Sequence, residues 1–181
     1  MPQHLDRKLA VILHADVIGS TRLVQINESL AHQRIVDAFR AFESSIDQFN
    51  GVVHEIRGDA LLATFSRGSD AVTAALAFQG HQKSANEKIE DDVFADLRIG
   101  IAMGEVIIAD GTITGAGVVL AQRLEQLCDA GEVIIQGAVY ETLPKHLPLN
   151  FNSLGEQKLK GFDETVRAYQ VATEADTVNS L

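Results

Sequence analysis

The chain has 181 residues, of which 46% are hydrophobic and 22% charged, a size and composition typical of one soluble globular domain. Its net charge of −10 argues against a nucleic-acid or anionic-membrane surface, because neither polyanion would be steered toward it. No apolar run approaches the roughly 20 residues of a membrane helix, residues 1–4 do not resemble a signal peptide, and Cys128 is the only cysteine. We therefore expect a cytoplasmic protein without an internal disulfide.

The first region of interest lies where an apolar run, residues 9–13, gives way to polar residues. We expect this run to form a buried strand, so that Asp16 stands where the strand ends. Gly19 follows, with Ser20 or Thr21 as the cap of a helix whose first amides are unpaired. A metal ion and a phosphate could meet at such a corner, although an aspartate there is more often a turn former or a helix cap.

A second acidic residue lies at a predicted hairpin. Residues 52–56 and 61–65 are predicted to form two short strands of a hairpin, with Gly58-Asp59 at the tip between them. If this hairpin pairs with the first strand, Asp59 comes close to Asp16. Two carboxylates at one edge of a sheet suit Mg²⁺, which prefers oxygen ligands.

Periodicity predicts the other elements of the first two thirds of the chain. They are a helix over residues 21–49, intact or broken within residues 27–32; a helix over 68–78 that fades into a charged stretch; and a strand over 97–103 that continues over 105–109 after a turn or bulge at Gly104. The resulting order, βαββαβ, is that of a ferredoxin-like sheet with two helices on one face.

The third region of interest is the loop over residues 110–119, which contains three glycines and opens a helix that runs to about Cys128. Glycines at a helix start can let the backbone approach a phosphate, but a surface loop is the commoner structure for this pattern. Arg123 falls inside that otherwise apolar helix. By itself such an arginine is more often solvated than bound to a ligand.

The last third is expected to add strands to the sheet. The predicted elements are strands over 133–135, 151–154 and 166–171, a short helix over 138–143, and a polar hairpin over 155–162 that carries two lysines. From residue 172 onward the apolar periodicity ends and we expect an irregular tail. The expected division is an N-terminal extension over 1–7, one catalytic domain over 8–171 and a tail over 172–181.

Four of these segments together carry a resemblance. They are the run around Asp16, Ala15-Asp16-Val17-Ile18-Gly19-Ser20-Thr21; Gly58-Asp59; Gly115-Ala116-Gly117 followed by Ala121-Gln122-Arg123-Leu124; and Leu159-Lys160-Gly161-Phe162. In this order and spacing the chain, from about residue 8 to about residue 171, resembles the catalytic domain of the class III adenylate and guanylate cyclases. The resemblance implies an α+β fold, a ferredoxin-like βαββαβ core with extra C-terminal strands.

The resemblance also implies an activity and a partner. The family converts a purine nucleoside triphosphate, ATP or GTP, into its 3′,5′-cyclic monophosphate and pyrophosphate, at sites shared by two chains paired head to tail in a homodimer. By resemblance, Asp16, Asp59 and the backbone carbonyl of Val17 would hold two Mg²⁺ or Mn²⁺ ions. Arg123 would stabilise charge on the α-phosphoryl oxygens, and Lys160 would contact the phosphates.

Two further positions bear on the base. Where many adenylate cyclases have a lysine and an aspartate, this chain has Glu55 and Thr112. A glutamate accepts from the N1 and N2 donors of guanine, so Glu55 favours GTP. However, Glu55 and Arg57 project to the same side of a strand and can pair with each other, which leaves the choice of base open. Gly19, Ser20 and Thr21 complete the expected substrate-binding set.

One departure from the family pattern concerns catalysis itself. The asparagine that usually stands four residues before the helix arginine is replaced by Val119, which cannot donate a hydrogen bond. A lost donor of this kind costs on the order of 10²–10³ in rate. The alternative function is therefore a catalytically weak or inactive module that dimerises and binds nucleotide. A diguanylate-cyclase or polymerase palm shares the sheet and acids, but its own motif loop is missing from the sequence.

Overall fold

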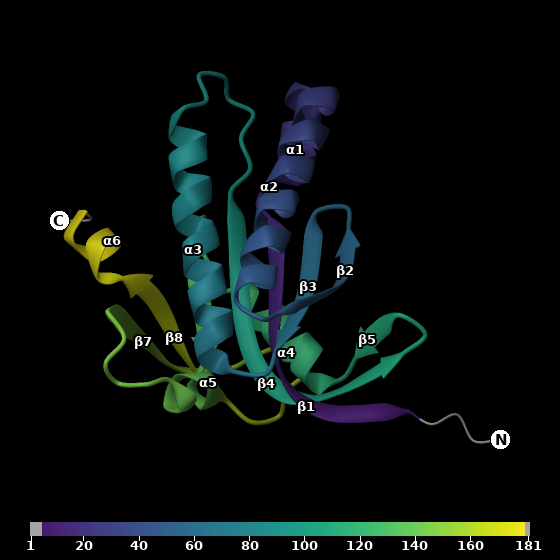
Figure 1. The fold of residues 1–181 in the computed structure, drawn as a ribbon, viewed down its shortest axis with the longest axis vertical. Coiled ribbons are helices and arrows are strands. Elements are labelled where there is room, and N and C mark those ends of the chain that lie inside the picture. Colours follow the sequence, from purple (N-terminus) through teal and green to yellow (C-terminus); the bar gives the residue numbers. More distant parts are fainter. Residues whose placement is uncertain (1–4, 180–181) are drawn as a thin grey trace.

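The structure is a computed structural model, and it describes residues 5–179. Figure 1 shows one twisted sheet with the long helices α2 and α3 side by side on one face. The strands are β1 Asp6–Val17, β2 Val52–Arg57, β3 Ala60–Phe65, β4 Leu97–Ala109, β5 Thr112–Thr114, β6 Val133–Gln136, β7 Leu149–Gln157 and β8 Val166–Thr173. The helices are α1 Ser20–Ile26, α2 Glu28–Gln48, α3 Gly68–Glu87, α4 Ala116–Glu125, α5 Gly137–Thr142 and α6 Glu174–Asn179.

The strand order confirms the predicted fold class. Strands lie in the order β2-β3-β1-β4-β6-β8-β7, and β5 pairs with β4 outside this path. The first four strands of that order pair antiparallel, as the βαββαβ arrangement requires, and β6 joins β4 in parallel. The strands β6, β8 and β7 are the extra C-terminal strands, so the ferredoxin-like core is extended at one edge.

Each face of the sheet has its own hydrophobic core, because successive side chains of a strand point to opposite faces. Val11 and Leu13 of β1 pack on the face that α2 and α3 cover, where Phe42 and Phe78 stack with ring centroids 4.2 Å apart. Ile12, between them, packs on the opposite face with residues of α4. The even-numbered residues of β1, Asp16 among them, therefore belong to the α4 face.

The helices differ from expectation in their ends. The first helical stretch is broken at Asn27, whose side chain accepts from the backbone N–H of Leu30 and caps α2. The helix α3 continues beyond its last predicted apolar residue, Phe78, and ends at Glu87, inside the charged stretch into which it was expected to fade. Its polar residues face the protein, where Gln82 and Asn86 donate to the backbone carbonyl of Ala95 at 3.1 and 2.8 Å. Hydrogen bonds thus replace the apolar contacts that periodicity detects.

The expected turn or bulge at Gly104 is also wrong. Strand β4 is continuous, and Gly104 pairs with Ala10 of β1 in regular register. A Cβ atom at Gly104 would lie 3.3 Å from Cα of Gly117, so the glycine lets α4 pack closely there. The helix α4 itself ends at Glu125, three residues before the predicted end at Cys128.

The chain stays regular beyond Val171, in place of the irregular tail expected from residue 172. Strand β8 ends at Thr173 and α6 follows. The backbone N–H of Asp176 donates to Oγ1 of Thr173, and that hydroxyl donates to the Asp176 carboxylate, so Thr173 caps the start of α6. Among the described residues, none of the helices combines the length and hydropathy that a membrane-spanning segment requires.

Candidate functional site

Asp16 lies near the end of β1, between two neighbouring strands. It is directly opposite Ala60 of β3 on one side and Arg98 of β4 on the other. The Arg98 guanidinium donates to both of its carboxylate oxygens, from Nε at 3.1 Å and from Nη2 at 3.0 Å. Such a bidentate pair is the strongest geometry available to an arginine and a carboxylate, so Arg98 fixes the orientation of Asp16.

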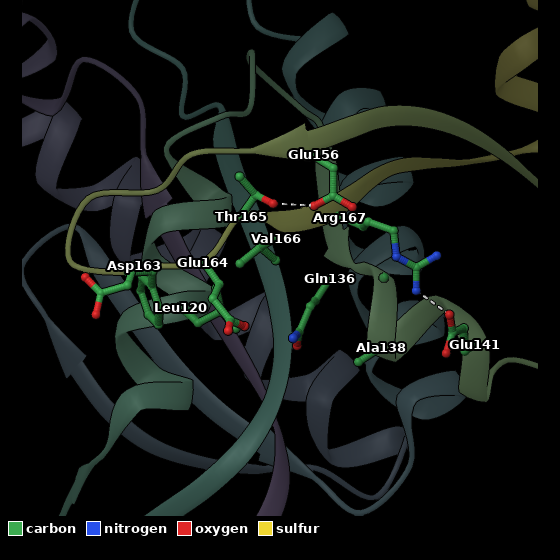
Figure 2. Close-up of a pocket in the computed structure, with 12 residues that line it drawn as sticks. Leu120, Gln136, Ala138, Glu141, Glu156, Asp163, Glu164, Thr165, Val166 and Arg167 are labelled. Atoms are coloured by element: carbon green, nitrogen blue, oxygen red, sulfur yellow. Dashed lines mark hydrogen bonds and ion pairs between the residues drawn. The ribbon is translucent and has the colours of Figure 1, made fainter.

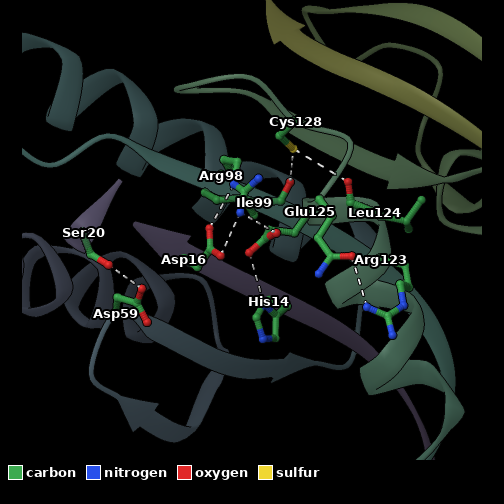
Figure 3. A network of polar contacts seen from close by, with 11 residues as sticks. His14, Asp16, Ser20, Asp59, Arg98, Ile99, Arg123, Leu124, Glu125 and Cys128 are labelled. Carbon is green, nitrogen blue, oxygen red and sulfur yellow. Dashed lines mark hydrogen bonds and ion pairs between the residues drawn. The ribbon is translucent and has the colours of Figure 1, made fainter. Parts of the chain in front are cut away.

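Asp59 comes to the same end of β1 from the β2–β3 turn. Its backbone carbonyl accepts from the N–H of Val17 at 2.9 Å, which fastens the hairpin tip to the strand end. Its carboxylate oxygen Oδ2 accepts from the Ser20 hydroxyl at 2.8 Å. The two predicted metal ligands thus lie at one strand end, but Arg98 holds Asp16 and Ser20 holds Asp59 (Figure 3).

The expected helix cap at Ser20 or Thr21 is wrong. Gly19 occupies the cap position of α1 in the left-handed conformation, with φ 63° and ψ 33°, and no side chain caps the helix. Ser20 is therefore the first helical residue, and its hydroxyl is directed to Asp59. Gly19 and Thr21 are exposed beside it.

A buried polar cluster that the sequence analysis missed lies behind Asp16. Glu125 of α4 is only 1% exposed; its Oε2 lies 3.5 Å from Nη2 of Arg98, and its Oε1 lies 3.7 Å from Nδ1 of His14. Within the described part of the chain, neither Glu125 oxygen nor this His14 nitrogen makes a hydrogen bond. Burial raises the pKa of Glu125 from its ordinary 4.5 to about 7. The only sequence signal was a charged residue, Arg98, inside an apolar strand.

The structure joins Arg123 to the loop that carries Lys160. Arg123 donates from Nε to the backbone carbonyl of Lys160 at 3.1 Å and from Nη1 to Oε1 of Gln126 at 3.1 Å. The Lys160 side chain is exposed. Figure 3 shows Arg123 set apart from the Asp16–Arg98–Glu125 cluster. The predicted phosphate-binding residues are therefore together, but they lie away from the predicted metal ligands of the same chain.

The two residues expected to contact the purine base of the nucleotide, Glu55 and Thr112, lie on β2 and β5. Glu55 pairs with Arg57 on β2, as their positions on one strand allowed. Both line a small cavity of about 210 Å³ whose other walls include His14 and Val118. Thr112 is exposed, and its hydroxyl donates to the backbone carbonyl of Ala109 at 2.8 Å. The Thr112 hydroxyl is thus used in a hydrogen bond within the β4–β5 strand pair.

A larger hollow lies elsewhere and does not suit a triphosphate. Figure 2 shows this cavity of about 670 Å³, between α5, β7 and the loop that leads into β8. Four carboxylates line it, those of Glu141, Glu156, Asp163 and Glu164, and its one arginine, Arg167, is paired with Glu141. Anions are repelled from such a lining. None of the predicted site residues contributes to it.

The donor set at the end of β1 fits a magnesium-type ion. No cluster of three or more histidine, cysteine, aspartate or glutamate side chains suited to a metal occurs among residues 5–179. Mg²⁺, however, usually binds proteins through one or two carboxylates and completes its shell with water and substrate phosphates. Asp16 and Asp59 supply that number of carboxylates, so a metal that arrives with a nucleotide fits the site.

Some curated proteins with related sequences are named as adenylate cyclases. The chain is 29% identical over 168 residues to "Putative adenylate cyclase 3" of Rhizobium meliloti (strain 1021), covering 92% of this chain and 29% of that protein. It is 30% identical over 141 residues to "Adenylate cyclase" of Streptomyces coelicolor, covering 77% of this chain and 35% of that protein. The chain thus spans about a third of the length of these relatives.

Solved structures give the same assignment. An adenylate/guanylate cyclase/hydrolase from Silicibacter pomeroyi superposes with a TM-score of 0.84 at 28% identity, covering 93% of this chain and 99% of that one. The adenylyl cyclase CyaB from P. aeruginosa has the same fold, with a TM-score of 0.76 at 23% identity and coverage of 93% and 96%. A sequence model described as "Adenylate and Guanylate cyclase catalytic domain" matches residues 6–173. The chain therefore belongs to the family of adenylate and guanylate cyclase catalytic domains.

Proposed function

We propose that this chain cyclises a purine nucleoside triphosphate, ATP or GTP, to its 3′,5′-cyclic monophosphate and pyrophosphate for cyclic-nucleotide signalling. The proposed site uses two Mg²⁺ or Mn²⁺ ions and lies between two chains paired head to tail in the cytoplasm. The observation that supports it best is the division of the site residues. Asp16 and Asp59 gather at one end of β1, while Arg123 and Lys160 gather on α4 and the loop beside it.

This division of the site residues explains why a second chain would be needed to complete the site. A triphosphate bound at the acids of one chain needs cationic side chains besides Arg98, which is already paired with Asp16, and Arg123 of the same chain is set apart from those acids (Figure 3). A second copy that presents its α4 would supply those side chains. Two large apolar side chains near the two half-sites, Ile56 of β2 and Val119 of α4, are 42% and 39% exposed. Apolar side chains of this kind are typical of the core of a protein–protein interface.

Each residue has a proposed task. Asp16, Asp59 and the carbonyl of Val17 bind the cations, with Ser20 orienting the Asp59 carboxylate through its hydroxyl. The bound cations would lower the pKa of the ribose 3′-hydroxyl and neutralise the triphosphate. Arg123 of the second chain donates to the α-phosphoryl oxygens as their charge increases, and its planar group suits that task. Lys160 of the second chain contacts the terminal phosphates.

The base is read near Glu55 and Thr112. In the free chain the carboxylate of Glu55 is paired with Arg57, and this ion pair weakens its ability to accept from guanine. The small cavity beside it, with His14 as a further wall, has room for part of a purine ring. Gly19, Ser20 and Thr21 complete the proposed substrate contacts at the start of α1.

The test is turnover of each nucleotide by the purified chain. Incubation with ATP or GTP and Mn²⁺, followed by chromatography, is expected to yield a cyclic product from one of them. Asp59→Ala should abolish it, whereas Asp92→Ala, which removes the same charge from an exposed loop, should leave it unchanged. If neither nucleotide gives product while metal-dependent nucleotide binding persists, the chain is instead a binding module, for which the exposed Val119 in place of asparagine is the structural reason.

A further inference from the structure

Arg98 stands between two carboxylates that belong to different elements. Its guanidinium holds both oxygens of Asp16 on β1, and the same Nη2 lies 3.5 Å from Oε2 of Glu125 on α4 (Figure 3). Glu125 is 1% exposed, and neither of its oxygens makes a hydrogen bond within the described residues. Buried carboxylates nearly always have such a bond. Glu125 is therefore an acceptor without a donor, a short shift away from one.

Cation binding at Asp16 conflicts with the present position of Arg98. The guanidinium occupies both oxygens of the carboxylate, and its positive charge repels a second cation there. Arg98 is about three quarters shielded from solvent, and a shielded charge that loses its partner is strongly disfavoured unless another acceptor replaces it. Within the described residues, the only other carboxylate that forms an ion pair with Arg98 is that of Glu125.

We propose that Arg98 is a shared counter-ion, a positioning residue that holds Asp16 in the metal-free chain and passes to Glu125 when a divalent cation binds Asp16. The inference rests on the proposed function at one point, that a cation binds Asp16. Glu125 lies two residues after Arg123 on α4. The transfer therefore couples metal binding at Asp16 of one chain to α4 of that chain. This is the helix that presents Arg123 to the other site of the dimer.

Direct Mn²⁺ binding tests the proposal without any catalytic step. Mn²⁺ is titrated into the full chain at pH 8, and the free ion is followed by its electron paramagnetic resonance signal. Glu125→Gln, which leaves Arg98 no ionised alternative to Asp16, should weaken Mn²⁺ binding by about tenfold. Glu105→Gln is the matched control, because it removes the same charge from an exposed pair with Arg7, and it should bind as the wild type does.

The second variant, Arg98→Met, should change Mn²⁺ binding in the opposite direction. Removal of the competing charge should tighten Mn²⁺ binding by about tenfold. Glu125→Gln should weaken Mn²⁺ binding far less when it is added to Arg98→Met than when it is made in the wild type. If Glu125→Gln binds Mn²⁺ as tightly as the wild type does while Asp16→Asn binds it more weakly, the proposed role of Arg98 is overturned and the metal role of Asp16 stands. Equal binding by Asp16→Asn and wild type would instead overturn the metal role of Asp16 in the proposed function. If Arg98→Met does not fold, the Glu125→Gln and Glu105→Gln pair decides.

Discussion

Glu125 is the carboxyl group whose ionisation folding opposes most clearly. Burial raises its pKa to about 7 in the folded chain, whereas an unfolded chain would give it the ordinary value of 4.5. The folded state therefore holds this proton more tightly, and the free energy of unfolding falls as the pH rises from about 4.5 to about 7. Below that range both states are protonated and the penalty disappears.

The resulting prediction concerns stability against pH. Between pH 5 and pH 8 the free energy of unfolding of the wild type should fall by about 2–3 kcal/mol relative to that of Glu125→Gln, which has no carboxyl group to ionise. Urea unfolding at each pH measures the difference, and the other titrating groups cancel between the two proteins. Glu105→Gln, at an exposed position, should follow the wild type. Parallel curves for wild type and Glu125→Gln would contradict the burial of an ionisable carboxyl group there.

Single residues differ in how visible they were in the sequence. Asp16 and Asp59 stood out because each is an acid beside a glycine-containing turn at the end of an apolar run. Arg98 and Glu125 have no such context, since one lies inside a strand and the other inside a helix. Arg98 meets Asp16 across 82 positions of sequence, only because β1 and β4 pair in one particular register. Such a contact follows from the assembled sheet and leaves no local pattern.

At the scale of elements, the packing of α4 on β4 places Arg123 and Glu125. Gly100 makes this contact possible, because a Cβ atom there would lie 2.2 Å from the Ala121 carbonyl oxygen and 2.4 Å from the backbone nitrogen of Glu125. Both atoms belong to the helix backbone, so no rotation of a side chain relieves the clash. The helix must move away from the sheet to accept any larger residue at this position.

Gly100→Ala is therefore expected to lower the free energy of unfolding by about 2–3 kcal/mol, and to reduce cyclase turnover further by displacing Arg123. Urea unfolding and product formation measure the two effects. Gly80→Ala is the control, since Gly80 lies in α3 with nothing within 4 Å of the added atom. It should stabilise the helix by up to about 1 kcal/mol. A Gly100→Ala protein as stable as the wild type would show that α4 is not packed as described.

Element types were predictable where burial follows a simple period. The alternating and helical patterns of apolar residues gave β1, the β2–β3 hairpin and the α2 stretch, and hence the ferredoxin-like order. They failed at the second half of α3, where Gln82 and Asn86 face inward through hydrogen bonds. They failed at α6 as well, although Thr173 and Asp176 are spaced as a capping box. Polar contacts, which hydropathy does not register, account for both errors.

At the scale of the whole molecule, a chain of net charge −10 is proposed to bind a polyanion. Its overall field repels a triphosphate, so binding depends on local cations, namely the metal ions and the few basic residues near the site. In one chain the two acids at the end of β1 and Arg123 on α4 are set apart (Figure 3). Two chains related by a twofold axis would form two equal sites, each with acids from one chain and Arg123 from the other.

Mixing two inactive variants tests this arrangement. Asp59→Ala and Arg123→Ala should each be inactive as homodimers, but a heterodimer of the two contains one site with both defects and one intact site. Co-expression in equal amounts gives about half heterodimers, and therefore about a quarter of wild-type turnover. Mixing Asp16→Ala with Asp59→Ala is the control, because both defects then lie in the same half of a site and every site stays impaired. Equal turnover from the two mixtures would mean that Arg123 acts beside the acids of its own chain, and the shared site would be wrong.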